Sequence, residues 1–238
     1  MKKQAMITGG SRGIGLAVAD YLASIGYDLV LIANNPQRLD QVRCQLLSTY
    51  PECNISLYPL DLVDTTVTEK EIQKILEIHP AIDLLFNNAG IIESGMVDIK
   101  GDQLRDLFNV NAISLLMIGN KVAEQMRQNQ AGYIINVASM AGILGVPKIG
   151  AYSATKAAII SYSKALFKEL LSHNVRVTCL CPSVVNTDMT DDGLMDNASK
   201  IQPEDLVKSV DYLLSLSDGA LVERLDIHCK PIALREFF

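Results

Sequence analysis

The sequence predicts an α/β fold: a doubly wound parallel sheet of about seven strands with helices on both faces. Short runs of Val, Ile and Leu alternate along the chain with longer amphipathic stretches. The apolar runs are nearly continuous, which is typical of parallel strands that are buried on both faces. The 238 residues contain no linker and no internal repeat. We therefore expect one domain over 1–238.

The first part of the chain alternates strand and helix with recognisable end signals. A strand at 4–8 precedes a helix at 14–25, which Gly26 would end as its C′ residue. A strand at 28–33 precedes a helix at 36–48, whose first residue, a proline, suits the start of a helix.

The alternation continues through the middle of the chain. A strand at 55–59 precedes a helix at 65–78, for which Asp64 is the expected N-cap. A strand at 82–86 precedes a long helical region at 102–127.

The last part repeats the pattern. Strands at 132–138 and 175–181 flank a helix that begins near Ala151, and a helix at 203–216 precedes a last strand at 225–229. The segment 183–202, called the lid below, has no clear periodicity. A loop of this length in a compact domain is typical of a cover over a binding site.

Charge and composition exclude several classes of function. The formal net charge is −6, so we expect no surface for nucleic acid or an anionic membrane. The apolar runs are shorter than the about 20 residues of a membrane span, and the first strand begins too early for a signal peptide. A soluble cytoplasmic protein is therefore expected.

The five cysteines form no C-x-x-C pair. This favours reduced structural thiols over a redox or metal site, and no metal is expected. Cys179 and Cys181 belong to an expected buried strand. Their thiols are predicted to point to opposite faces of the sheet.

The segment TGGSRGIG at 8–15 joins the first strand to the first helix. Glycines permit positive φ and a close approach of the backbone to a pyrophosphate, which the N-terminal N–H groups of a helix bind. The G-x-x-x-G-x-G spacing departs from the G-x-G-x-x-G dinucleotide fingerprint. Its place as the first strand-to-helix turn nevertheless favours a dinucleotide site over a structural turn.

The end of the second strand bears on the choice of dinucleotide. An acidic residue there binds the ribose 2′-hydroxyl of NAD(H), and a basic residue accepts the 2′-phosphate of NADP(H). This chain has Asn34 and Asn35, while Arg12 of the glycine loop can supply positive charge. NADP(H) is therefore favoured, with NAD(H) as the alternative. The other interpretation of Arg12 is a solvated loop residue.

Tyr152 and Lys156 are four residues apart in an expected helix and so share one face. A nearby ammonium favours the phenolate and lowers the tyrosine pKa from about 10 toward the range of acid–base catalysis. Ser139, at the end of the preceding strand, can polarise a substrate carbonyl. The alternative is a packed tyrosine beside a lysine that reaches solvent.

Four features together resemble the short-chain dehydrogenase/reductase family: TGGSRGIG at 8–15, NNAG at 87–90, Ser139, and Tyr152-x-x-x-Lys156. They occur in the family's order over almost the whole chain, and Ser139 precedes Tyr152 by thirteen residues, as in the family. The resemblance implies a Rossmann fold and NAD(P)-dependent hydride transfer between a carbonyl and an alcohol. Similarity to 3-oxoacyl-[acyl-carrier-protein] reductases implies a small-molecule substrate, with an acyl thioester as one class.

The resemblance also implies residue roles. Tyr152 would be the general acid/base, and Lys156 would lower its pKa and bind the nicotinamide ribose. Ser139 would position the substrate oxygen, Asn111 would support a water-linked proton relay, and Asp61 would contact the adenine. The cofactor-binding residues so implied are Gly9, Ser11, Arg12, Gly13, Ile14, Gly15, Asn34, Asp61, Leu62, Asn88, Ala89, Gly90, Val110, Tyr152, Lys156, Pro182, Val185 and Thr187, with 135–137 beneath the cofactor.

Two segments depart from the family pattern. The family has Pro-Gly after the sixth strand, whereas this chain has Pro182-Ser183, whose added Cβ is expected to alter the loop. Relatives end with a V-D-G-G segment, whereas 220–229 reads ALVERLDIHC here. The last strand and its pairing across subunits are therefore left open.

The helix that begins near Ala151 is also expected to make subunit contacts. The small residues on its other face permit close helix packing and, with the apolar stretch 115–117 of the preceding helix, predict subunit contacts: Ala154, Ala157, Ala158, Ser161 and Ala165. The resemblance implies that these two helices form a homodimer, usually within a homotetramer. Burial of these small residues within the chain's own fold is the alternative.

A different class of function is a catalytically silent nucleotide sensor or scaffold. The intact Ser139 and Tyr152 argue against this alternative.

Overall fold

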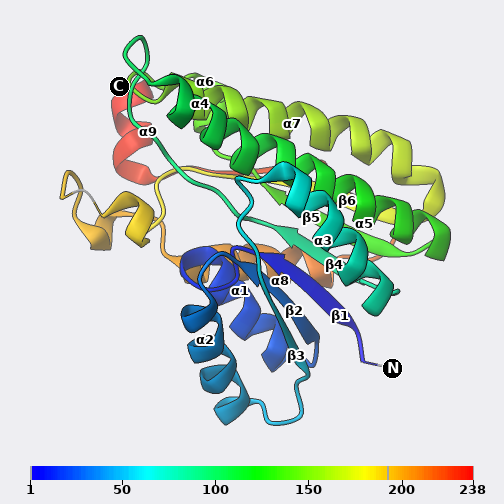
Figure 1. The fold of residues 1–238 in the computed structure, drawn as a ribbon. Helices are drawn as coiled ribbons and strands as arrows, with labels where there is room; N and C mark the ends of the chain where they lie inside the picture. The colour runs from blue at the N-terminus through cyan, green and yellow to red at the C-terminus, as the bar shows by residue number, and fades with distance from the viewer. Residues whose placement is uncertain (1, 192, 238) are drawn as a thin grey trace.

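The computed structural model describes residues 2–191 and 193–237 and contains one seven-stranded sheet (Figure 1). The strand order is β3-β2-β1-β4-β5-β6-β7, and all six pairings are parallel. The order reverses between β1 and β4, so the sheet is doubly wound, as predicted. The strands are β1 (Gln4–Thr8), β2 (Asp28–Ala33), β3 (Ile55–Pro59), β4 (Leu84–Asn87), β5 (Gly132–Val137), β6 (Val175–Pro182) and β7 (Arg224–Ile227).

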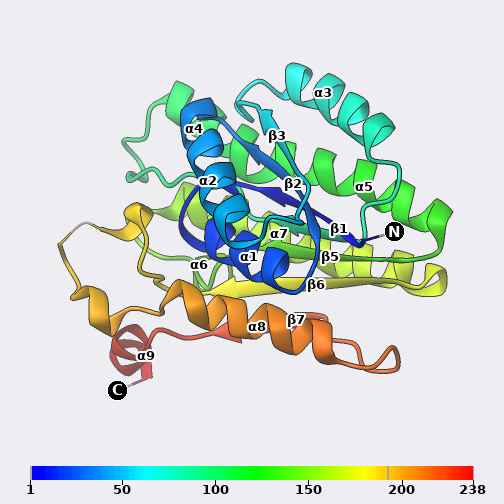
Figure 2. The ribbon, with the colours of Figure 1, turned by 90° about the horizontal axis from the view of Figure 1, so that it is seen from below.

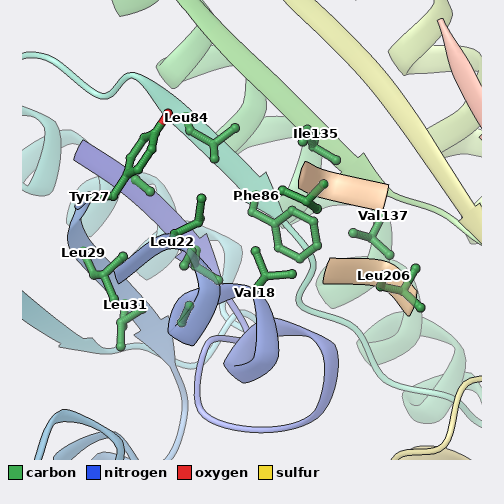
Figure 3. Packing of buried hydrophobic residues seen from close by; sticks show 14 of the residues in the cluster. Val18, Leu22, Tyr27, Leu29, Leu31, Leu84, Phe86, Ile135, Val137 and Leu206 are labelled. Carbon is green, nitrogen blue, oxygen red and sulfur yellow. The ribbon is translucent and has the colours of Figure 1, made fainter. Parts of the chain in front are cut away.

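Helices cover both faces of the sheet (Figures 1 and 2). One face packs against α1 (Gly13–Ser24), α2 (Pro36–Thr49) and α8 (Pro203–Ser215). The other face packs against α3 (Thr65–Ile78), α5 (Leu115–Asn129) and α7 (Gly150–Leu170). Figure 3 shows Val18 of α1 beside Phe86 of the sheet. Among the described residues, no helix combines the length and apolar character that a membrane crossing needs.

Local residues mark the helix boundaries close to where the sequence predicts them. Gly26, with φ of +90°, follows α1, and the Asp64 carboxylate accepts a hydrogen bond from the Val67 N–H at 3.0 Å at the start of α3. The Asn35 side chain caps α2 by accepting from the Arg38 N–H at 2.8 Å. Asn35 therefore has a structural role that the sequence analysis did not assign.

The long helix predicted over 102–127 consists of three segments. α4 (Gly101–Phe108) passes into a π-helical turn (Asn109–Ser114) and then into α5. Such π turns are frequent at functional sites. Two short helices were not predicted, α6 (Ala141–Leu144) and α9 (Lys230–Phe237), because neither is long enough to show a clear apolar period.

The prediction for Cys179 and Cys181 is wrong. Both thiols are buried on β6 and their sulfurs lie 3.7 Å apart. Side chains alternate along a strand, so residues two apart point to the same face. All five cysteines are free thiols.

The last strand pairs within the sheet despite its unusual sequence. β7 lies parallel to β6 in a register that matches Cys179 with Arg224. Ser183, the first residue after β6, donates its N–H to the Ile227 carbonyl at 2.8 Å. The backbone φ of Ser183 is not positive, so the Cβ that Ser183 adds causes no backbone strain at this point.

His79 makes the stability of the fold depend on pH. Its Nε2 lies 2.8 Å from the Tyr58 hydroxyl and its Nδ1 lies 3.1 Å from the Gln4 side-chain oxygen. Burial lowers the pKa of His79 below its ordinary value, so the unfolded chain binds a proton first. We expect the free energy of unfolding to fall as pH drops below about 6.5.

Urea unfolding at several pH values compares wild type with His79→Gln, which cannot titrate. The wild type is expected to lose more stability than the variant as pH drops from about 7 toward about 5. Parallel curves for the two proteins across this range would contradict the prediction.

Candidate active site

A cavity of about 490 Å³ lies at the carboxyl ends of the strands. This edge includes the reversal between β1 and β4, where open α/β sheets bind ligands. Of the residues expected to bind cofactor or catalyse, all but Gly15 and Asn111 line this cavity. Those on its wall are Gly9, Ser11, Arg12, Gly13, Ile14, Asn34, Asp61, Leu62, Asn88, Ala89, Gly90, Val110, Ser139, Tyr152, Lys156, Pro182, Val185 and Thr187. Val137 also lines it, whereas Ile135 is buried in the core.

The glycine loop lines the cavity. Gly9 and Gly13 have φ of +68° and +52°, a conformation that side chains disfavour. A Cβ added at Gly15 would collide with the Gly9 carbonyl oxygen, so Gly15 lets the helix pack against the loop instead of lining the cavity. α1 begins at Gly13 on the wall, and the first N–H groups of a helix have no partner within it, so they are available to an anion. These residues fit a dinucleotide pyrophosphate.

A buried polar network holds the neighbouring strands together behind this loop. The Thr8 hydroxyl donates to the Asn87 side-chain oxygen at 3.1 Å, and the Asn88 N–H donates to the Thr8 hydroxyl at 2.9 Å. The Asn87 amide donates in turn to the Leu115 carbonyl and to the Asn136 side chain. Thr8, Asn87 and Asn136 belong to segments singled out from the sequence, but this role in linking the strands was not predicted for them, although an asparagine inside an apolar strand is itself a signal.

Tyr152, Lys156 and Ser139 lie together on the cavity wall. Lys156 is 4% exposed, which contradicts the alternative of a lysine that reaches solvent. Its Nζ donates to the Val137 carbonyl at 3.0 Å and lies 5.7 Å from the centre of the Tyr152 ring. Tyr152 packs against Leu107 in a small apolar cluster.

Burial dominates the titration of this group. Burial raises the pKa of Tyr152, and its hydrogen bond with Ser139 acts in the opposite direction. Burial lowers the pKa of Lys156 to about 8, while the thiols of Cys179 and Cys181 raise it. The pKa of Tyr152 therefore lies above its ordinary value, and the group that lowers it is the Ser139 hydroxyl, whereas that contribution was expected from Lys156.

Asn111 lies behind the cavity wall. It belongs to the π-helical turn and is fully buried. Its amide donates to the Ile91 carbonyl and its oxygen accepts from the Ile91 N–H, both at 2.8 Å. A Cβ at Gly90 would lie 3.3 Å from the Asn111 oxygen and 3.5 Å from the Lys156 Nζ. Asn111 therefore fixes the backbone beside Lys156.

Arg12 and Asp188 connect the glycine loop to the lid. The Arg12 Nη1 lies 3.1 Å from the Asp188 Oδ2, with the two side chains 54% and 67% exposed. Ion pairs as exposed as this contribute little to stability. The Arg12 guanidinium can therefore exchange this partner for a ligand anion at little cost.

Several cavity residues were missed by the sequence analysis. They come from loops and short helices, where no periodicity marks a buried side. They include Ile91, Ile92, Leu144, Val146, Ile149, Met189 and Ile232.

A glycine loop and a Ser–Tyr–Lys group in one cavity define a dinucleotide-binding oxidoreductase class. The family model described as short chain dehydrogenase matches residues 3–197. The chain belongs to this family and is an NAD(P)-dependent oxidoreductase.

Known proteins resemble the chain over nearly its full length. It is 32% identical over 232 residues to 3-oxoacyl-[acyl-carrier-protein] reductase FabG of Chlamydia trachomatis, covering 92% of each chain. The crystal structure of a β-ketoacyl-[ACP] reductase from Bacteroides thetaiotaomicron has a TM-score of 0.83 at 32% identity, covering 98% of this chain and 100% of that one. The structure of ElxO with NADP bound has a TM-score of 0.86 at 26% identity, with coverage of 98% and 100%.

Proposed function

We propose that this chain transfers hydride between NADP(H) and a carbonyl or alcohol substrate, with Tyr152 as the general acid/base. The main support for this proposal is that Ser139, Tyr152 and Lys156 line the same cavity as the glycine loop. A bound nicotinamide supplies or accepts the hydride at the carbonyl carbon. The chain's own residues must then hold the carbonyl oxygen and move one proton.

Ser139 and Tyr152 act on the substrate oxygen in this proposal. Both side chains line the cavity, so an oxygen placed between them accepts two hydrogen bonds. These bonds stabilise the negative charge that develops on the oxygen during reduction. Tyr152 then donates its phenolic proton to that oxygen and recovers a proton when the reaction runs toward oxidation.

Lys156 stabilises the phenolate that remains after the proton has moved. Its ammonium lies 5.7 Å from the ring centre, and an opposite charge at close range favours the ionised tyrosine. An ammonium has three donors, of which one binds the Val137 carbonyl, so others can hold ribose hydroxyls. Asn111 is a positioning residue here, and its part in a water-linked relay stays a prediction.

We propose NADP(H) over NAD(H) from the charges near the ribose. Asn34 lines the cavity and does not repel a 2′-phosphate, and Arg12 lines the same cavity. The presence of NADP in the ElxO structure supports this choice.

The substitution Arg12→Ala is expected to weaken NADPH binding by about tenfold, because it removes a charged contact to phosphate. NADH binding should not change, since NADH lacks that phosphate. Fluorescence titration of both nucleotides measures the effect. Asp188→Asn is the matched control, because it frees Arg12 from its lid partner and should leave NADPH binding equal or tighter. Tighter binding of NADH than of NADPH by the wild type would contradict the proposal.

The rival function is a nucleotide sensor or scaffold without turnover. A broad panel of ketones, assayed by NADPH oxidation, separates the two functions. Turnover of any panel member supports the enzyme. NADPH binding without oxidation across the whole panel favours the rival.

We propose a cytoplasmic homodimer or homotetramer that packs through α5 and α7. Ala154, Ala157 and Ser161 are exposed on α7, and small side chains allow a close helix approach. Sedimentation analysis measures the assembly, and a monomer at micromolar concentration would contradict it.

A further inference from the structure

The substrate end of the cavity is distinct from its cofactor end. Asp61 follows β3 at one side of the sheet, while Ser139 and Ser183 follow β5 and β6 on the other side of the reversal. Beyond Ser139 the wall comes from the loop after β4, α6, the loop before α7, the lid and α9. Its large side chains are apolar: Ile92, Leu144, Val146, Ile149, Met189 and Ile232.

Among the described cavity-lining residues, no cationic side chain is available to pair with an anion at the substrate end. The charged side chains on this wall belong to Arg12, Asp61, Lys156 and Asp188. Arg12 is paired with Asp188, and Lys156 is buried against Val137. A carboxylate or phosphate in contact with the apolar wall would lose its hydration without a cation in return.

The C-terminal helix α9 forms part of this wall. Figures 1 and 2 show α9 near the lid, at the carboxyl end of the sheet. Cys229, just before α9, is buried, with its sulfur 3.8 Å from the Met195 sulfur and 3.5 Å from the Ser199 carbonyl oxygen of the lid. The N–H of Ile232 donates to the Cys229 carbonyl at 3.0 Å. The start of α9 is thus anchored to the lid, with Ile232 on the cavity wall.

We infer that the substrate is a neutral, mainly apolar carbonyl compound and that Ile232 is a specificity-determining residue. The inference rests on the proposed function, since it assigns the substrate of that same site. An apolar wall binds an apolar substituent by removing both surfaces from water. The same wall disfavours ketones that carry an anionic group near the carbonyl.

The test compares benzylacetone with its para-carboxylate, two ketones that differ in one charged group, and includes acetoacetyl-CoA as an anionic thioester. The kcat/KM of the wild type should be at least about tenfold higher for the neutral ketone. Ile232→Ala should lower kcat/KM for benzylacetone by about ten- to a hundredfold. Ile232→Arg should shift the preference toward the carboxylate. NADPH affinity should stay unchanged in both variants.

Leu234→Ala is the matched control, because Leu234 lies on the same helix and is 50% exposed. It should leave the kinetics unchanged. A wild-type preference for the carboxylate or for acetoacetyl-CoA would overturn the inference while leaving the proposed function intact.

Titration calorimetry on the NADP⁺-loaded protein measures ketone binding directly, so it tests the substrate inference without requiring turnover. The neutral ketone should bind more tightly than its carboxylate even where neither is reduced. Absence of turnover with every ketone would count against the proposed function. Equal binding of the two ketones, or no effect of Ile232→Arg on their ratio, would overturn the substrate inference.

Discussion

Replacing Tyr152 by phenylalanine is expected to lower kcat for carbonyl reduction by about a thousandfold while NADPH affinity is retained. The phenyl ring keeps the packing against Leu107 and Ala141. Only the hydroxyl that donates the proton is removed. Steady-state NADPH oxidation with a ketone measures kcat, and fluorescence titration measures nucleotide binding.

Tyr162→Phe is the matched control for this substitution. Tyr162 lies on the same helix, and its hydroxyl donates to the Asn120 side chain at 2.9 Å, outside the cavity. This variant should retain turnover close to the wild-type rate. A Tyr152→Phe enzyme within tenfold of the wild type would show that another group supplies the proton.

Replacing Lys156 by methionine is expected to abolish most activity and, in the nucleotide-free protein, to raise the free energy of unfolding near neutral pH. The Lys156 ammonium is buried, and burial lowers its pKa to about 8. Methionine fills a similar volume without that desolvation cost. We expect a gain of about 1–3 kcal/mol near pH 7, reduced by the loss of the hydrogen bond to the Val137 carbonyl.

The gain should depend on pH with a definite sign. The pKa of Lys156 is about 8 in the folded protein and about 10.4 in an unfolded chain. Between these values the unfolded wild type binds more protons, so wild-type stability rises with pH. The advantage of Lys156→Met should therefore shrink as pH rises from about 8 toward about 10.

Urea unfolding without nucleotide tests this, because bound nucleotide would add its own stabilisation. Lys164→Met is the control, since Lys164 lies on the same helix and is exposed. Its effect on stability should be small at every pH. A destabilised Lys156→Met protein at neutral pH would contradict this prediction, because it would show that the buried lysine stabilises the fold.

The fold could be predicted because its signals are local. Continuous apolar runs mark buried strands such as 28–33 and 175–181, and their physical basis lies within a few neighbouring residues. The caps at Gly26 and Asp64 are local in the same way. The structure confirms these features within one or two residues at each end.

The errors and omissions have physical reasons as well. The cysteine prediction misapplied the strand period, since Cys179 and Cys181 share a face and their sulfurs lie 3.7 Å apart. The π-helical turn around Asn111 interrupts a helix whose apolar period is continuous, so no pattern reveals it. Ile232 lies on a helix too short to display a buried side.

The sequence by itself determined the family, the parallel sheet, the glycine loop and the candidate Ser139, Tyr152 and Lys156. Motif order and short-range periodicity are properties of the chain alone. Only the tertiary structure decided that Lys156 is buried, that Asn111 lies behind the wall, and that Ile232 lines the same cavity as Ser139. Those properties depend on contacts between segments far apart in the chain, because burial and electrostatics are set by what packs around a side chain.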